Sequence, residues 1–296
     1  MSTVCLVDGN AVAYTIDLDK CKTEKDFLKS YLYRLREYAK QFTSLPKFVL
    51  FFDSKSGGNW REKIYPDYQK GRRDQRDKYT PKQKEDAEKR SKYLDFIKHC
   101  FDSSRYKYIS YPHTETDDLL ALYCNNIQKD NETAVILTTD KDLFQLIRST
   151  GNRKVQVLFL IKRQLIKDEE LGKKALKEKI WLGDNSDSIP GVCKNVGKVT
   201  FPDFYTFIEK MKETNTDPTD KSEAKRISES LGIKYIPSFS NFDAEQLSLN
   251  RKLIDLSYVV ELDKQNNNEK TQFLQENVEK AKFSPFALVS MFQSLT

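Results

Sequence analysis

The sequence is poor in histidine and in organised cysteine. Its 296 residues include two histidines, His99 and His113, which removes most histidine-based catalysis and most zinc chemistry from consideration. The five cysteines are odd in number and never spaced as C-x-x-C. They indicate reduced thiols of a cytosolic protein rather than a disulfide framework or a zinc site. They are Cys5, Cys21, Cys100, Cys124 and Cys193.

Long hydrophobic runs are also missing. No stretch approaches the roughly 18 apolar residues of a membrane span. The start, MSTVCLVDGN, is a short apolar strand leading into an acidic turn, unlike a secretory signal. We therefore expect a cytoplasmic protein with no membrane partner. The net charge of +6, from 50 Lys and Arg against 44 Asp and Glu, is only weak evidence for a nucleic-acid partner.

The order of apolar segments predicts an α/β fold around a mostly parallel, twisted sheet. Buried strands, rich in Val, Ile, Phe and Tyr, are expected at 3–8, 47–53, 105–111, 133–140 and 154–160. Helical spacing at 24–42 and 116–128 falls between them, as in an α/β domain. From about residue 165 onward no clear strand follows, and helices are expected at 171–181, 200–212, 222–231, 246–256 and 284–293.

Acidic residues gather where strands end and helices begin. Any one of them is explained by a turn, an N-cap or the helix dipole. The set is not, because several such groups would meet at the carboxyl edge of one sheet and repel each other unless cations neutralised them. The set is Asp8, Asp53, Glu115, Asp117, Asp118, Asp140, Asp142, Asp184 and Asp187.

Carboxylate oxygens without His or Cys favour Mg²⁺ or Mn²⁺ over zinc. Two such ions, about 4 Å apart, suit hydrolysis of a phosphodiester, because they activate water and stabilise the charge on the attacking and leaving oxygens. The sequence therefore predicts a two-metal hydrolase.

Five motifs in order resemble the flap endonuclease/5′→3′ exonuclease family, whose nuclease domain is PIN-like. They are VDGN, FFDS, ETDDLLA, TTDKDLFQL and GDNSDSIPGV. The resemblance runs from about residue 4 to 200. Within the family, the segment SGGNWREKIYPDYQKGRR looks most like the T-even-phage ribonuclease H.

The resemblance implies two sets of metal ligands. The first ion would be held by Asp8, Asp53, Glu115 and Asp117. The second would be held by Asp117, Asp140, Asp142 and Asp187, with Asp118 and Asp184 as nearby acidic partners. It also implies a nuclease domain over 1–178, with a basic arch-like insertion at about 68–98, and a helical DNA-binding part over 179–296.

The family's arch begins with a Y-K-x-x-R motif whose Lys and Arg contact the scissile phosphate. Aligning on Tyr68 selects Gln69 and Arg72, whereas the K-x-x-R spacing selects Lys70 and Arg73. Lys70 and Arg72 are the residues we name, and the register stays open. Further basic side chains would bind DNA through backbone electrostatics alone. They are Arg73, Arg76, Lys82, Lys84, Lys89 and Arg90.

Two further features bear on DNA binding. Tyr14 falls where the family often has an aromatic residue that stacks on the terminal base, although a core position on the first helix is an equal alternative. The loop IPGVCKNVGKV resembles the family's helix-three-turn-helix, which would bind duplex phosphates and K⁺. Its glycine pattern is incomplete, which puts the K⁺ site in doubt. Its candidate residues are Gly191, Lys194, Gly197 and Lys198.

The resemblance implies a monomeric 5′-nuclease acting on DNA with 5′ ends or flaps and on RNA–DNA hybrids, and removing primers in lagging-strand replication. A single-strand-binding protein and a replicative polymerase would be its partners. Two alternatives remain: a PIN-type ribonuclease for single-stranded RNA, and a non-catalytic DNA-junction binder. The ribonuclease alternative does not explain the basic insertion, and the DNA-junction binder does not explain the full acidic set.

Overall fold

The computed structural model describes residues 2–42, 44–54, 59–214, 216, 220–233 and 243–287. Its chain packs as two compact units. The first comprises the residues up to Ile64, Arg76–Lys173 and the residues from Leu256 onward, and the second comprises Tyr65–Gln75 and Lys174–Asp255. Each unit therefore combines segments that are distant in the sequence.

The first unit is built on a five-stranded sheet in the order β2-β1-β3-β4-β5. The first four strands run parallel, and β5 pairs antiparallel with β4. The α/β fold with a mostly parallel sheet is thus confirmed. The strands are β1 (Ser2–Asp8), β2 (Lys47–Phe51), β3 (Glu132–Thr138), β4 (Lys154–Phe159) and β5 (Gln164–Ile166).

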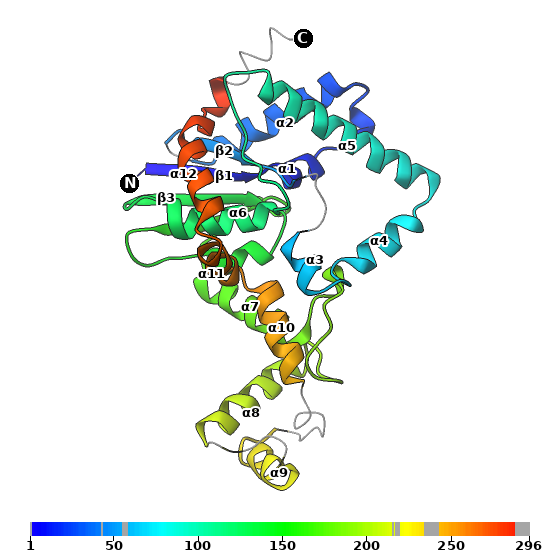
Figure 1. Ribbon diagram of the computed structural model, residues 1–296, viewed down its shortest axis with the longest axis vertical. Helices are drawn as coiled ribbons and strands as arrows, with labels where there is room; N and C mark the ends of the chain where they lie inside the picture. The colour runs from blue at the N-terminus through cyan, green and yellow to red at the C-terminus, as the bar shows by residue number, and fades with distance from the viewer. Residues whose placement is uncertain are drawn as a thin grey trace. The chain divides into compact units, whose positions relative to one another are not determined.

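Helices cover both faces of this sheet, so its central strands are apolar on both sides. Along β1, Cys5 and Val7 join one core cluster, and Val4 and Leu6 join the other. The first cluster lies under α1 (Gly9–Tyr14), α2 (Glu24–Ala39) and α5 (Pro81–Asp102). The second lies under α6 (Thr116–Leu122), the π-helix η2 (Tyr123–Ile127), α11 (Ser257–Gln265) and α12 (Glu269–Ala281). Figure 1 shows α2 and α6 on opposite sides of the strands.

The predicted strand at 105–111 was wrong. Only Ile109 bridges to the sheet, beside Phe51, through one pair of backbone hydrogen bonds. The edge of β2 is shared, because Phe283 forms an antiparallel bridge with Phe48 a few residues away. Tyr106 packs edge-on against Phe283, so the segment serves as a packed cover and not as a strand.

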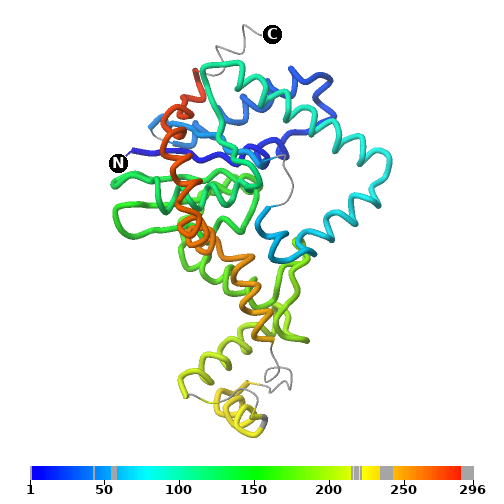
Figure 2. Tube along the Cα trace, in the orientation of Figure 1, coloured from blue at the N-terminus to red at the C-terminus, as the bar shows by residue number. Residues whose placement is uncertain are grey.

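Helices α11 and α12 were not expected, yet they are part of the first unit. Figure 2 shows this orange-to-red segment running beside the green α6. The buried carboxylate of Asp263 accepts backbone N–H bonds from Lys270 and Thr271, at 3.0 and 3.1 Å, and so caps α12. The predicted helix at 284–293 lies mostly outside the described residues.

The polar stretch between residues 54 and 104 is helical wherever it is described. It contains α3 (Trp60–Ile64), α4 (Lys70–Asp77) and α5. Thr80 and Gln83 form a capping box at the start of α5, with Pro81 at the first helical position. The half of α5 up to Lys92 has no buried residue, whereas Tyr93, Ile97 and Phe101 enter the core. His99 is exposed on α5.

The second unit is helical. It contains most of α7 (Glu169–Leu182), the short helix η4 (Asn185–Asp187), α8 (Phe201–Glu213), α9 (Lys221–Ser230) and α10 (Ala244–Ile254). Trp181, Phe204 and Phe207 form its main core. These helices match the expected ones within a few residues. Among the described residues, no helix is both long and apolar enough to cross a membrane.

Candidate metal centre and nucleic-acid interface

Two acidic side chains of the first unit are fixed at the carboxyl ends of β1 and β2. Asp8 ends β1, where its Oδ1 caps α1 by accepting the Ala11 N–H at 2.9 Å and its Oδ2 accepts the Thr138 hydroxyl at 3.1 Å. Asp53 follows β2, and its Oδ1 accepts the Thr116 N–H at 2.8 Å. Asp53 therefore links the end of β2 to the N-terminus of the acidic helix α6.

Two more acids follow β3 in the same unit. The Thr138 Oγ1 accepts the Asp140 N–H at 3.0 Å, and Asp140 Oδ1 accepts the Asp142 N–H at 2.8 Å. Because β2, β1 and β3 are adjacent and parallel, the residues after them lie at one edge of the sheet. The predicted placement of these strand-end acids is confirmed.

Asp117, in the first turn of α6, is the electrostatic centre of this group. Its pKa lies well above the ordinary value because it is desolvated and faces the charges of Asp140, Asp8, Glu115 and Asp53. Desolvation, with further contributions from Asp53 and Asp140, raises the pKa of Asp8 to about 7. We call these five carboxylates (Asp8, Asp53, Glu115, Asp117 and Asp140) the acidic edge. A divalent cation would relieve their mutual repulsion.

Glu115 and Asp118 differ from the rest because they have a cationic partner in the same unit. The Arg61 guanidinium lies 2.6 Å from Glu115 Oε2 and 2.8 Å from Asp118 Oδ1. The Trp60 indole N–H donates to Asp118 Oδ2 at 2.9 Å. Sequence reasoning missed Arg61, because a single arginine in a polar stretch carries no signal of burial.

A pocket of about 360 Å³ opens beside Asp53. Its cationic side chain is Lys98, whose Nζ donates to the Asp53 carbonyl oxygen at 3.1 Å and lies over the Phe52 ring. The other lining residues are Asp95, His99, Asp102, Tyr108 and Ser110. A lysine is thus held next to the acidic edge.

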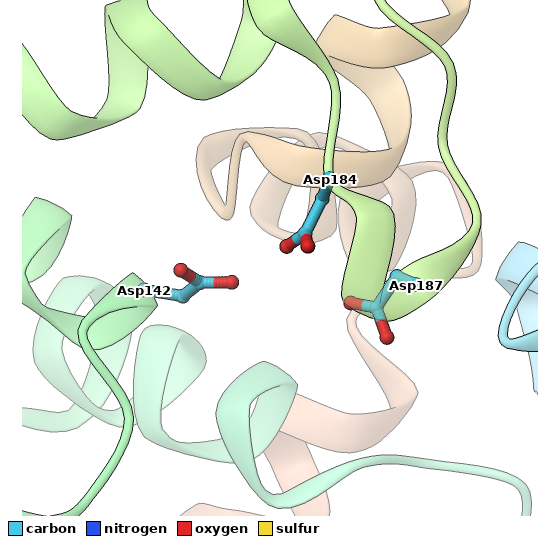
Figure 3. A group of neighbouring side chains, drawn as sticks. All are labelled: Asp142, Asp184 and Asp187. Carbon is cyan, nitrogen blue, oxygen red and sulfur yellow. The ribbon is translucent and has the colours of Figure 1, made fainter. Parts of the chain in front are cut away.

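In the second unit, Asp184 and Asp187 lie together around η4, with carboxylate oxygens within 4.8 Å of each other. Figure 3 shows both side chains, together with that of Asp142 from the first unit. The Lys179 ammonium lies 2.5 Å from Asp184, and the Arg72 guanidinium lies 2.8 Å from Asp187. The pKa of Asp184 is lowered, because its bonds to Lys179 and Ser186 outweigh desolvation, the largest single effect.

The start of the basic insertion, residues 69–72, forms hydrogen bonds and an ion pair with the acidic loop at residues 186–188. Besides its ion pair, Arg72 donates through Nε to the Ser186 carbonyl at 3.0 Å. The Gln69 N–H donates to the Asp187 carbonyl, and the Gly71 N–H donates to Ser188 Oγ at 2.7 Å. Lys70 is exposed and pairs with Asp67 at 3.2 Å. Arg73 donates to the Pro66 carbonyl, and Arg76 is exposed on α4.

The basic side chains of α5 divide into exposed and anchored ones. Lys82 pairs with Asp86 at 3.0 Å, and Lys84 is exposed. Lys89 donates to the Leu18 carbonyl at 3.1 Å. Arg90 donates to the Ala13 carbonyl at 2.6 Å, at the C-terminal end of α1. Lys89 and Arg90 therefore attach α5 to the segment that follows β1.

Tyr14 is 66% exposed, so it is not a core residue. The Arg90 guanidinium lies 4.8 Å from its ring centroid. One side of the ring is thus covered by a cation, and most of the rest is accessible for stacking.

The loop between α7 and α8 holds the remaining candidates. Gly191 packs closely, since a Cβ there would lie 2.8 Å from the Leu182 carbonyl oxygen. Gly197 lies at the turn before α8, where its N–H donates to Thr200 Oγ1 at 3.0 Å. Lys194 and Lys198 are both exposed, and Lys198 lies 3.7 Å from Glu178. Helix, loop and helix follow each other as expected, and the DNA-binding role stays a prediction.

Carboxylates at the ends of adjacent parallel strands in an α/β domain are typical of metal-dependent enzymes that act on phosphate esters. The family model for the 5′-3′ exonuclease N-terminal resolvase-like domain matches residues 3–180. The chain belongs to this 5′-3′ exonuclease family, as the sequence motifs indicate.

Relatives support this membership. The chain is 31% identical over 214 residues to the thermostable DNA polymerase I of Thermus caldophilus, a match that covers 67% of this chain and 23% of the polymerase. It thus spans about a quarter of the length of that relative. It is 26% identical over 208 residues to a 5′-3′ exonuclease of Buchnera aphidicola subsp. Acyrthosiphon pisum, covering 64% of this chain and 66% of that one.

Solved structures share the fold. The bacteriophage T5 flap endonuclease, in a complex with DNA and metal ions, matches with a TM-score of 0.69 at 19% identity, over 94% of this chain and 99% of that chain. The T5 5′-exonuclease with bound zinc ions matches with a TM-score of 0.67 at 18% identity, with the same coverage. At this level of identity the likeness establishes the fold alone.

Proposed function

We propose that the protein is a divalent-metal-dependent 5′-nuclease, acting as a 5′→3′ exonuclease and flap endonuclease. The observation that carries the proposal is the acidic edge, where burial and the neighbouring carboxylates raise the pKa of Asp117 and Asp8. Membership of the 5′-3′ exonuclease family supports the same chemistry. The T5 relative complexed with DNA and metal ions makes DNA the first substrate to test.

Asp8, Asp53, Glu115 and Asp117 would hold the first ion. The second set of ligands, which the family resemblance implies, stays part of the proposal. Mg²⁺ fits these hard oxygen donors, and Mn²⁺ would substitute. When bound, such ions lower the pKa of water and stabilise charge on phosphate oxygens. The residues themselves orient one another: Asp8 and Asp53 are fixed by hydrogen bonds to Ala11 and Thr116.

Residues of both the nuclease domain and the helical part would bind the substrate. Arg72 and Lys70 would contact the scissile phosphate, and Tyr14 would stack on the terminal base. Residues 1–178 would carry the nuclease chemistry, and 179–296 would bind duplex DNA, with K⁺ possible at the α7–α8 loop. We also propose action on RNA–DNA hybrids, and hence primer removal on the lagging strand. The protein would act as a monomer in the cytoplasm, that of the host cell if phage-encoded, beside a single-strand-binding protein and a polymerase.

The test is cleavage of a 5′-labelled flapped DNA duplex and of an RNA–DNA hybrid, each with Mg²⁺ and with EDTA. The proposal predicts short 5′ products that require Mg²⁺ and disappear in Asp117→Asn. The exposed Asp130 pairs with Arg153 away from the acidic edge, so Asp130→Asn is the matched control and should cleave normally. Tight flap binding without cleavage would instead favour the non-catalytic DNA-junction binder.

A further inference from the structure

Arg61 is a buried cation between two carboxylates of one helix. Its side chain is 5% exposed, and its two terminal nitrogens face different residues of α6. Nη1 lies 2.6 Å from Glu115 Oε2, and Nη2 lies 2.8 Å from Asp118 Oδ1. The planar guanidinium has donors on a rigid fork, so it can hold two acceptors at a fixed separation, which a lysine ammonium cannot do.

Asp118 uses both carboxylate oxygens within the protein. Its Oδ1 faces Arg61, and its Oδ2 accepts the Trp60 indole N–H at 2.9 Å. The side chain is fully buried. Because Asp118 is fully buried with its oxygens against Arg61 and Trp60 of α3, a metal ion would have to displace one of these contacts to reach it.

Trp60 is held in turn. Its ring lies 5.6 Å from that of Tyr258 on α11, and the Arg61 guanidinium lies 4.4 Å from the Trp60 ring. These contacts lie within the first unit. The Trp60–Tyr258 contact attaches α3, near the start of the polar insertion, to α11, while the contacts with Glu115 and Asp118 attach it to α6.

Glu115 occupies the N-cap position of α6, but its side chain makes no capping hydrogen bond there. It is 25% exposed, unlike Asp118. The Arg61 contact therefore orients Oε2 of Glu115.

We propose that Trp60, Arg61 and Asp118 form a clamp that positions Glu115 for the first ion. Asp118 is the counter-ion of Arg61 and not a ligand. This inference rests on the proposed function, in which Glu115 binds a divalent ion. It also connects α3, near the start of the polar insertion, to the metal site, because Trp60 and Arg61 belong to α3.

The experiment is a titration of the whole chain with Mn²⁺ in the absence of DNA, which measures ion affinity without reference to activity. The variants are Arg61→Gln, Asp118→Asn and the double variant. Outer partners of metal ligands typically change metal affinity by about 10–100-fold. We expect each single variant to weaken the tighter Mn²⁺ site by about tenfold. We expect the double variant to bind about as well as either single one, since both changes break one clamp.

If Asp118 were a ligand, the pattern would differ. Asp118→Asn would weaken Mn²⁺ binding, whereas Arg61→Gln would leave it unchanged or tighten it by removing a competing cation, and the effects would add. That result would overturn the clamp. Unchanged binding in all three variants would also overturn it. No Mn²⁺ binding by the wild-type chain would overturn the proposed function itself, so the two failures are distinguishable.

Loss of folding is controlled in two ways. Arg148→Gln removes another partly buried arginine of the first unit, which donates to the Cys124 carbonyl and, at 3.1 Å, to Gln128. It should lower the melting temperature but leave Mn²⁺ affinity unchanged. Arg61→Lys keeps the charge, and we expect it to restore folding but only part of the affinity. Full restoration of Mn²⁺ affinity in Arg61→Lys would contradict the requirement for the two guanidinium nitrogens of Arg61.

Discussion

The two units treat their acidic residues in opposite ways. In the first unit, the ion pairs of the described residues include none on Asp8, Asp117 or Asp140, and the pKa values of Asp8 and Asp117 are raised. In the second unit, Asp184 and Asp187 each lie within 2.8 Å of a cationic side chain, and the pKa of Asp184 is lowered. The same residue type is thus under electrostatic strain in one unit and neutralised in the other.

The difference is that Asp8, Asp117 and Asp140 face other carboxylates, whereas a cationic side chain already lies beside Asp184 and Asp187. Burial and mutual repulsion raise the free energy of the ionised acidic edge, and a divalent ion would recover it. Lys179 and Arg72 already supply that compensation around η4. Asp118, paired with Arg61, resembles the second unit in this respect although it lies in the first.

The largest effect should come from Asp117, the centre of the acidic edge. Asp117→Asn removes the carboxylate that faces the charges of the other four. We expect turnover to fall by about 10³-fold, because metal ions contribute several kcal/mol to such reactions. DNA affinity measured in Ca²⁺ should change little. Single-turnover cleavage and a binding titration would check both. Turnover within a few fold of wild type would remove the basis for the metal assignment.

A smaller effect is expected from the basic face of α5. Neutralising Lys82 and Lys84, which are both exposed, to Gln should weaken flap binding and reduce its salt slope by about 2, since each phosphate contact contributes roughly 0.9. The measurement is the dissociation constant across a range of salt concentrations. Neutralising Lys264 and Lys280, two other exposed lysines of the first unit, is the matched control. An equal slope in the two double variants would leave the arch without support.

Asp184→Asn probes the self-neutralised acids. It removes an ion pair with Lys179 and weakens the cap on Ser186, whose N–H Asp184 accepts at 2.9 Å. We expect a loss of about 1–3 kcal/mol in unfolding free energy. Urea unfolding would measure it. A change of less than a few tenths of a kcal/mol would show that this pairing contributes nothing to the second unit.

The smallest effects are those of pH, and they have opposite signs in the two units. The pKa of Asp8 is raised to about 7 in the folded chain, so the folded state binds its proton more tightly than the unfolded state. This stabilisation is present below pH 4 and is lost as the pH rises toward 7. The pKa of Asp184 is lowered, so its contribution is present above pH 4 and is lost on acidification. Melting temperatures in EDTA should therefore fall between pH 5 and 8, less so in Asp8→Asn. A metal-free protein that grows more stable over that range would contradict the strain at the acidic edge.

Much of the fold and of the acidic edge could be predicted from sequence, because both follow local rules. Apolar runs ending in Asp8, Asp53 and Asp140 specify parallel strands, and parallel strands bring their ends together. The strand predicted at 105–111 was wrong, because β-branched and aromatic residues also occur in packed segments that are not strands. Its pairing is limited by Phe283, which is far away in sequence.

What could not be predicted depends on contacts between distant segments. Nothing near Arg61 in the sequence indicates that it is buried between Glu115 and Asp118. Lys89 and Arg90 appear as part of a solvated basic run, yet both donate to backbone carbonyls of the first unit. A charge pattern alone does not distinguish a cation that binds a partner from one that anchors a helix.

The most direct test of the central claim is a calorimetric titration of the wild-type chain with Mn²⁺ at pH 6 and pH 8, in buffers of different ionisation enthalpy. If the acidic edge binds the ion, binding should be tighter at pH 8. It should also release protons at pH 6, because Asp8, with a pKa of about 7, is largely protonated there. Asp117→Asn should abolish the tight phase. Affinity that is independent of pH, without proton release, would show that the ion binds elsewhere and that the acidic edge is not the metal centre.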